Sequence, residues 1–120
     1  MLKPVFDSQT IHTIIEALRK IVGADFVFVD EENKDKYAHD ETENLHFVPD
    51  VVVKPKTPEE ISSIMKLCNE HLIPITPRGG GTGLSGGALP ILGGVLLSVE
   101  RMNNIINIDE RNLQVVCEPG

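Results

Sequence analysis

Aromatic residues are scarce in this sequence. Its 120 residues include four Phe, one Tyr and no Trp, so the core has to be built mainly from Ile, Val and Leu. Clusters of positive charge are missing as well, because the formal net charge is -7 and the 11 Lys and Arg are scattered. Nucleic-acid-binding proteins normally carry a basic face, and we therefore predict no nucleic-acid partner.

The sequence also lacks closely spaced cysteines, the spacings typical of metal ligands, and long apolar runs. The two cysteines, Cys68 and Cys117, are far apart, which excludes a disulfide framework and favours reduced core thiols. The four histidines show no ligand spacing, so no metal site is predicted. No apolar run could cross a bilayer, and residues 1–10 lack a signal-peptide core. We expect a cytoplasmic protein without a transmembrane segment.

Hydrophobic periodicity predicts the elements of the first 44 residues. Apolar residues at helical spacing predict a helix over 8–22, which Asp7 or Ser8 can cap. The apolar run 26–29 predicts a short strand. The polar segment 30–44 is expected to be a loop, with at most a short strand near its single tyrosine.

The stretch 51–76 predicts a strand, a helix and a second strand. Its first strand is the β-branched run Val51–Val53, and its second covers 72–77. Between them, Thr57-Pro58-Glu59-Glu60 supplies a helix cap, a proline at the first helical position and a capping box. The buried face of this helix is expected to carry Ile61, Ile64, Met65, Cys68 and Leu72. Such a crossover normally joins two parallel neighbouring strands.

Short strands are predicted after residue 93. They cover 94–99, 105–108 and 113–117, and residues 109–112 form a hairpin turn between the last two. The predicted fold class is therefore α+β, in which a βαβ unit is followed by short strands. A chain of this length fits one domain.

Six glycines are concentrated between Pro77 and Gly87. Glycine loses more backbone entropy on folding than any other residue, so this concentration needs an explanation. A mobile linker fits poorly, because the segment directly joins two apolar strands and carries an interleaved Arg, Thr and Ser. A loop whose backbone N–H groups converge on an anion fits better, since glycine permits positive φ and close approach.

The common phosphate-binding motifs do not account for this loop. Residues 81–86 match the dinucleotide pattern G-x-G-x-x-G, but that pattern requires a helix to open within the motif. Gly87, Pro90, Gly93 and Gly94 follow instead, and no helix can begin there. A P-loop is excluded too, because no Lys follows its second glycine.

Several ordered blocks carry a resemblance to a known family. They are 49–55, 57–61, 74–88, 101–103 and 116–120, with a looser block at 37–40. Together they resemble the FAD-binding domain of vanillyl-alcohol-oxidase-type, or PCMH-type, flavoproteins, and within these the glycolate oxidase FAD subunit and the D-lactate dehydrogenases. By this resemblance, residues 1–120 are the N-terminal part of such an FAD-binding domain, and the rest of that domain and the substrate domain are absent.

The resemblance implies that the glycine-rich loop holds FAD. The residues expected to bind the cofactor are Pro77, Arg78, Gly79, Gly80, Gly81, Thr82, Gly83, Ser85 and Gly86. Two roles stay open for Arg78, a cation near the phosphates or a member of a surface ion pair. Some family members attach the flavin covalently to a loop histidine. Thr82 occupies that position here and cannot serve, so FAD is expected to be non-covalent.

The resemblance also implies an activity for a longer parent protein. The parent would oxidise a small 2-hydroxy acid such as glycolate or D-lactate. No catalytic or metal-binding residue can be carried over to this chain, which is expected to be inactive alone. Asp40 and Glu43 are expected to form a solvated face rather than an acid–base pair. Unpaired apolar strand edges are expected to drive self-association.

Two alternatives remain at this point. The chain could be a non-catalytic module with the same fold that binds a nucleotide or a protein partner. It could also be a MurB-like or molybdenum-hydroxylase flavin domain, which shares the broad architecture. The run Pro77–Gly83, followed by Arg101-Met102-Asn103, favours the hydroxy-acid group over these domains.

Overall fold

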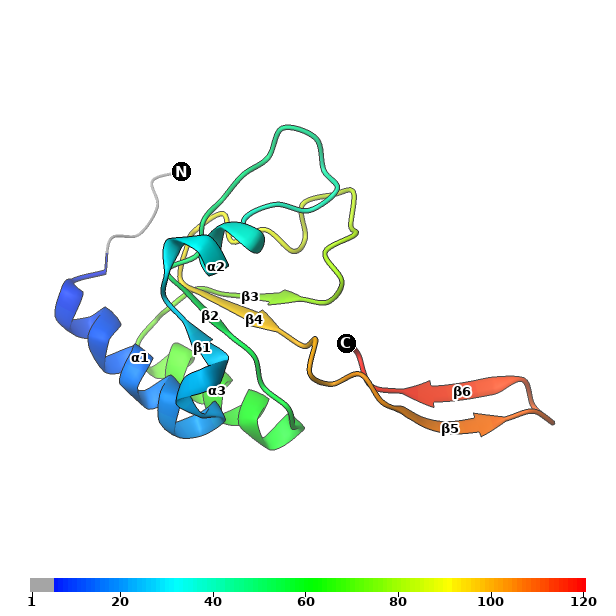
Figure 1. Ribbon diagram of the computed structural model, residues 1–120. Coiled ribbons are helices and arrows are strands. Elements are labelled where there is room, and N and C mark those ends of the chain that lie inside the picture. The colour runs from blue at the N-terminus through cyan, green and yellow to red at the C-terminus, as the bar shows by residue number, and fades with distance from the viewer. Residues whose placement is uncertain (1–5) are drawn as a thin grey trace.

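The computed structural model describes residues 6–120 (Figure 1). Three helices, one 3₁₀ turn and six strands follow one another along this part of the chain. In chain order they are α1 (Ser8–Val22), η1 (Ala24–Phe26), β1 (Val27–Phe28), α2 (Glu31–Lys36), β2 (Val51–Val53), α3 (Pro58–Glu70), β3 (Ile75–Arg78), β4 (Val95–Ser98), β5 (Ile105–Asp109) and β6 (Gln114–Cys117). The α+β prediction is confirmed.

The two long helices begin where their capping residues predict. The side chain of Asp7 accepts the N–H of Thr10 at 2.8 Å at the start of α1. At the start of α3, Thr57 Oγ1 accepts the N–H of Glu60 at 3.2 Å. The carboxylate of Glu60 turns back and accepts the N–H of Lys56 at 2.6 Å, one residue before the cap. Each helix thereby pairs N–H groups that have no partner inside the helix.

The main sheet has the strand order β1-β2-β4-β3. Strand β1 is antiparallel to β2, and β4 is parallel to both β2 and β3. The prediction that β2 and β3 are neighbours is therefore wrong, because β4 lies between them. Strand β4 reads Val-Leu-Leu-Ser and is buried at every position, which suits a central strand with both faces covered.

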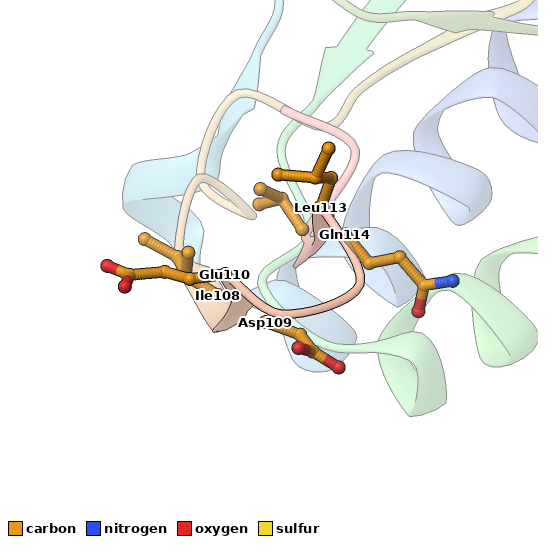
Figure 2. A pocket seen from close by; sticks show the side chains of 6 residues that line it. Ile108, Asp109, Glu110, Leu113 and Gln114 are labelled. Atoms are coloured by element: carbon orange, nitrogen blue, oxygen red, sulfur yellow. The ribbon is translucent and has the colours of Figure 1, made fainter.

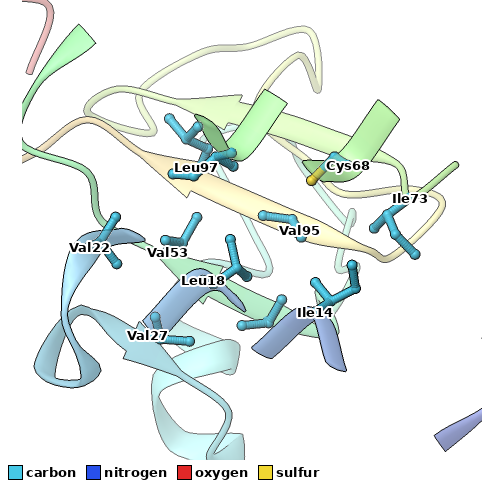
Figure 3. Packing of buried hydrophobic residues seen from close by; sticks show 11 residues of the cluster. Ile14, Leu18, Val22, Val27, Val53, Cys68, Ile73, Val95 and Leu97 are labelled. Carbon is cyan, nitrogen blue, oxygen red and sulfur yellow. The ribbon is translucent and has the colours of Figure 1, made fainter. Parts of the chain in front are cut away.

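Alternate residues of β2 and β4 face opposite sides of the sheet. Val51, Val53, Val95 and Leu97 pack with α1 and α3 in one hydrophobic cluster, as Figure 3 shows for the labelled residues. Ile14 and Leu18 of α1 and Ile64 and Cys68 of α3 complete the helical side of this cluster. Val52 and Leu96 are also fully buried, on the other face. The cluster fixes the sheet from which the loops of the candidate site emerge.

The segment expected to be an unstructured loop contains helix α2. Its start is capped by Asp30, whose carboxylate accepts the N–H of Asn33 at 3.0 Å. Acidic residues occupy its first turn and lysines its last, an arrangement that favours the helix dipole. The helix buries none of its residues, so it has no apolar stripe by which periodicity could reveal it.

Three residues expected in the core are exposed. The exposed fractions of Met65 and Leu72 are 46% and 83%. Met65 lies within α3 beside the buried Ile64, whereas Leu72 lies beyond the end of α3 at Glu70 and adopts a positive φ of 54° in the turn that follows. Cys117 lies exposed in β6, whereas Cys68 is buried. Burial raises the pKa of the Cys68 thiol to about 11. Only one cysteine therefore matches the expected core thiol.

Strands β5 and β6 form a separate antiparallel hairpin. It extends away from the main sheet in Figure 1, and its apolar side chains are largely exposed. These are Ile105, Ile106, Ile108, Leu113, Val115 and Val116. Within residues 6–120, no helix combines the length and the apolar character that a membrane span requires.

Candidate functional site

The glycine-rich loop, defined here as residues 79–87, leaves the main sheet at the carboxyl end of β3 (Figure 1). Ligands of open sheets with parallel strands typically bind beyond the carboxyl ends of those strands. The loop is mostly exposed, with only Gly81 and Gly86 partly buried. Its position and exposure leave its backbone accessible to a ligand.

A run of backbone N–H groups in this loop has no internal acceptor. Among the described residues, no hydrogen bond is donated by any N–H from Gly79 to Ser85. Backbone N–H groups normally find a partner in the protein or in solvent, and successive free ones form concave anion sites. The donors therefore fit a pyrophosphate, which offers several acceptor oxygens and no N–H or O–H donor of its own when ionised.

The backbone conformation and the neighbours of position 81 require a glycine there. Its φ is +71°, and a Cβ at this position would lie 2.3 Å from Arg78 Nη2. Any side chain would therefore both strain the backbone and displace the guanidinium group. Gly80, in contrast, would place a Cβ no closer than 4.0 Å to Thr82 Cγ2, so that its neighbours leave space for a side chain.

Arg78 lies beneath the loop rather than on its surface. Its exposed fraction is 9%, and its Nη1 donates a hydrogen bond to the backbone oxygen of His39 at 2.7 Å. No salt bridge of Arg78 occurs within the described part of the chain. The surface ion pair considered for Arg78 is thus wrong, and the guanidinium group instead ties the start of the loop to a distant segment.

Asp40 is buried beneath the same loop, which corrects its assignment to a solvated face. Its exposed fraction is 8%, and its Oδ1 accepts the N–H of Thr42 at 2.8 Å. Its Oδ2 is buried and has no hydrogen-bond partner among residues 6–120. Hydrogen bonds from Thr42, and to a lesser extent the charge of Arg78, lower the pKa of Asp40 despite its desolvation.

The remaining predicted site residues fall into two groups. Thr82, Gly83 and Ser85 are exposed on the loop and carry free N–H groups. Pro77 lies in β3 and has no N–H to offer, and the N–H of Gly86 is already donated to Thr42 Oγ1 at 2.9 Å. The free N–H run therefore ends before Gly86.

A hollow of about 330 Å³ lies elsewhere, at the tip of the β5–β6 hairpin. Figure 2 shows its lining side chains, which include Ile108, Leu113 and Gln114. It is largely apolar and open, and none of the predicted site residues line it. The anion-binding donors and this hollow are separate features.

The glycine-rich loop lies in a part of the chain that matches a known protein family. Residues 49–120 match the family model described as an FAD binding domain. The chain belongs to this FAD-binding family. The matched residues contain β2, α3, β3, the glycine-rich loop and everything after it, so the free N–H run lies within the residues that match the FAD binding domain.

Individual relatives agree with this assignment. The chain is 45% identical over 84 residues to glycolate oxidase subunit GlcD of Bacillus subtilis, covering 70% of this chain and 18% of that protein. It is 40% identical over 108 residues to a D-lactate dehydrogenase of Anaerostipes hadrus, covering 89% of this chain and 22% of that protein. The predicted FAD cofactor is confirmed at the level of the family.

The fold agrees as well. A crystal structure of p-cresol methylhydroxylase with substrate bound superposes with a TM-score of 0.84 at 30% sequence identity, covering 95% of this chain and 23% of that chain. The resemblance to PCMH-type flavoproteins is thereby confirmed. The chain spans about a fifth of the length of these relatives.

Proposed function

We propose that the glycine-rich loop binds the pyrophosphate of FAD through the backbone N–H groups of residues 79–85. The observation that carries this proposal is the uninterrupted run of N–H groups without internal acceptors. Thr82 and Ser85 lie among them and add exposed hydroxyls. Because Thr82 cannot form a bond to the flavin, the cofactor is held non-covalently. FAD supplies a ring system that accepts a hydride.

We further propose that the chain is the FAD-binding portion of an oxidoreductase for small 2-hydroxy acids. Support comes from relatives named glycolate oxidase and D-lactate dehydrogenase. The described residues contain no cluster of three or more His, Cys, Asp or Glu that could hold a metal ion. The groups that bind substrate and take its hydroxyl proton are proposed to lie outside residues 1–120. The cytoplasmic location stays a prediction.

The proposed activity predicts a contrast between this chain and the complete gene product. We expect the complete product to reduce a redox dye in the presence of glycolate or D-lactate, and the 120 residues alone to show no turnover. Acetate, which lacks the hydroxyl group, serves as the control substrate. Turnover by the 120 residues would contradict the placement of the catalytic groups, and no turnover by the complete product with either acid would contradict the substrate class.

The exposed hairpin predicts self-association of the isolated chain. Apolar side chains on β5 and β6 are more than half exposed, and both outer edges of this two-stranded sheet lack a partner strand in the described residues. Such edges pair readily with other chains. We expect light scattering to show a mass that rises with concentration and falls in an Ile106→Lys variant. A wild-type chain that stays monomeric at high concentration would contradict this.

A further inference from the structure

A second segment of the chain lies against the glycine-rich loop. This segment, residues 39–42, is called the strap. Arg78 Nη1 donates to the backbone oxygen of His39 at 2.7 Å, and the N–H of Gly86 donates to Thr42 Oγ1 at 2.9 Å. Figure 1 shows the chain around the strap and the loop side by side beyond the carboxyl end of β3. The strap is thus hydrogen-bonded to the residues that flank the free N–H run on both sides.

The middle of the loop also meets the strap. A Cβ at Gly83 would lie 3.9 Å from Asp40 Oδ2, which is the buried carboxylate oxygen without a hydrogen-bond donor. Burying an acceptor without a hydrogen-bond donor costs free energy of folding. Packing of the core gives no reason for placing such an oxygen behind a loop of free N–H groups. Start, middle and end of the loop each have a neighbour on the strap.

The strap is held in shape by its own contacts. The N–H of Thr42 donates to Asp40 Oδ1 at 2.8 Å, and just outside the strap the N–H of Phe47 donates to the backbone oxygen of Ala38 at 2.7 Å. The pKa of Asp40 is lowered, mainly by its hydrogen bonds with Thr42. An ionised Asp40 keeps accepting the N–H of Thr42 and so keeps the Thr42 hydroxyl in place.

The charges behind the loop have opposite signs. The positive charge of Arg78 favours ionised Asp40, and the guanidinium group is already engaged with His39. Arg78 is therefore placed to hold the loop from behind while neutral N–H groups face the ligand. This arrangement differs from a site in which a cation contacts the phosphates directly.

A loop this rich in glycine needs such support. Fixing the backbone of one residue costs roughly 1–2 kcal/mol, and glycine has the most freedom to lose. A loop that already holds its binding conformation avoids part of this cost when the ligand arrives. The hydrogen bonds that Arg78 and Gly86, on either side of the free N–H run, donate to the strap would provide this order.

We propose that Thr42 is a positioning residue of the cofactor site: its hydroxyl, by accepting the N–H of Gly86, fixes the far end of the glycine-rich loop in the conformation that binds the pyrophosphate. Arg78 does the same at the near end through His39. This inference rests on the proposed function of the loop. Thr42 itself touches the loop rather than the cofactor, so its effect has to be measured through loop order and affinity together.

The test compares three threonine variants. Thr42→Val removes the hydroxyl, Thr42→Ser keeps it, and Thr76→Val removes a hydroxyl of β3 that makes no hydrogen bond among residues 6–120. We expect Thr42→Val to bind FAD about 10-fold more weakly than the wild type, which corresponds to roughly 1.4 kcal/mol. Thr42→Ser and Thr76→Val are expected to bind like the wild type.

A second readout needs no cofactor. Chymotrypsin cleaves after Leu84 in the loop, which is 75% exposed, and after Leu113 in the hairpin, which is 91% exposed. In Thr42→Val we expect cleavage after Leu84 to become several-fold faster while cleavage after Leu113 keeps its rate, because only the loop has lost a hydrogen bond. Faster cleavage at both sites would indicate general destabilisation and would overturn the proposal.

The remaining outcomes separate this inference from the function on which it rests. Equal FAD affinity of wild type and Thr42→Val would overturn the role of Thr42 and leave the proposed function standing. Weak binding by Thr42→Ser as well would show that the hydroxyl is not the relevant group. A wild-type chain that does not bind FAD would contradict the proposed function, and the positioning role for FAD would fall with it.

Discussion

Gly80→Asp is expected to weaken FAD binding about 100-fold without disturbing the fold. The new carboxylate would stand among the free N–H groups, where it would accept those donors itself and repel the pyrophosphate. Loss of one or two hydrogen bonds to a charged group costs about 3 kcal/mol, which corresponds to a factor of about 100 in affinity. Since the neighbours of Gly80 leave space for a Cβ, the protein should accept the change. A titration followed by flavin fluorescence measures the effect.

Gly87→Asp is the matched control for this variant. It adds the same charge in the same segment, but it lies beyond the free N–H run, and a Cβ there would have no atom within 4 Å. We expect its FAD affinity to stay within a few-fold of the wild type. Equal losses in both variants would attribute the effect to net charge. Gly81→Asp is less informative, because its side chain would also displace Arg78.

Gly94→Ala is expected to be the most destabilising single substitution considered. Gly94 has a φ of +73°, and a Cβ there would lie 2.2 Å from the backbone oxygen of Pro74. The N–H of Gly94 also donates to Asp50 Oδ2 at 2.6 Å, and its backbone oxygen accepts the N–H of Asp50 at 2.9 Å. Gly94 thus lies between the beginnings of β2 and β3, where β4 enters the sheet.

The expected loss in the free energy of unfolding is about 3 kcal/mol or more, from backbone strain and overpacking together. A domain of this size has roughly 5–15 kcal/mol in total, so the variant should stay folded in buffer but unfold at a clearly lower urea concentration than the wild type. Urea denaturation followed by circular dichroism measures the difference. In Gly87→Ala the new methyl group has no neighbour within 4 Å. Its free energy of unfolding should therefore lie within about 0.5 kcal/mol of the wild-type value. Equal midpoints for the two alanine variants would refute the account of Gly94.

Local signals predicted much of the fold because they act within a few residues. Thr57 caps α3 and Asp7 caps α1 as their positions predict, since a cap is decided by hydrogen bonds three residues apart. The order of strands is decided differently. Strand β4 lies between β2 and β3. The sequence between residues 51 and 78 contains no signal that a later strand will be inserted between these two.

In the candidate site, too, the local feature could be predicted from the sequence and the long-range contact could not. The glycine-rich loop could be found because its composition is unusual over a short stretch. The strap could not, because Asp40 and Thr42 stand in a charged segment whose composition predicts exposure. The burial of Asp40 and the partial burial of Thr42 depend on a loop some 40 residues later. Helix α2 was missed for a related reason, since it is stabilised by its cap and its charges and buries no side chain. Resemblance at residues 37–40 was the only signal that pointed to the strap.

The most direct test of the central claim is to observe which backbone N–H groups respond to FAD. In a ¹⁵N-labelled chain, we predict saturable shifts of the amide signals of Gly79 to Ser85 on addition of FAD, with Gly87 and the hairpin unaffected. Riboflavin, which lacks phosphates, should leave the loop signals in place. Shifts confined to the hairpin hollow at Ile108 and Leu113, or the same loop shifts with riboflavin, would contradict the claim that this loop binds the pyrophosphate.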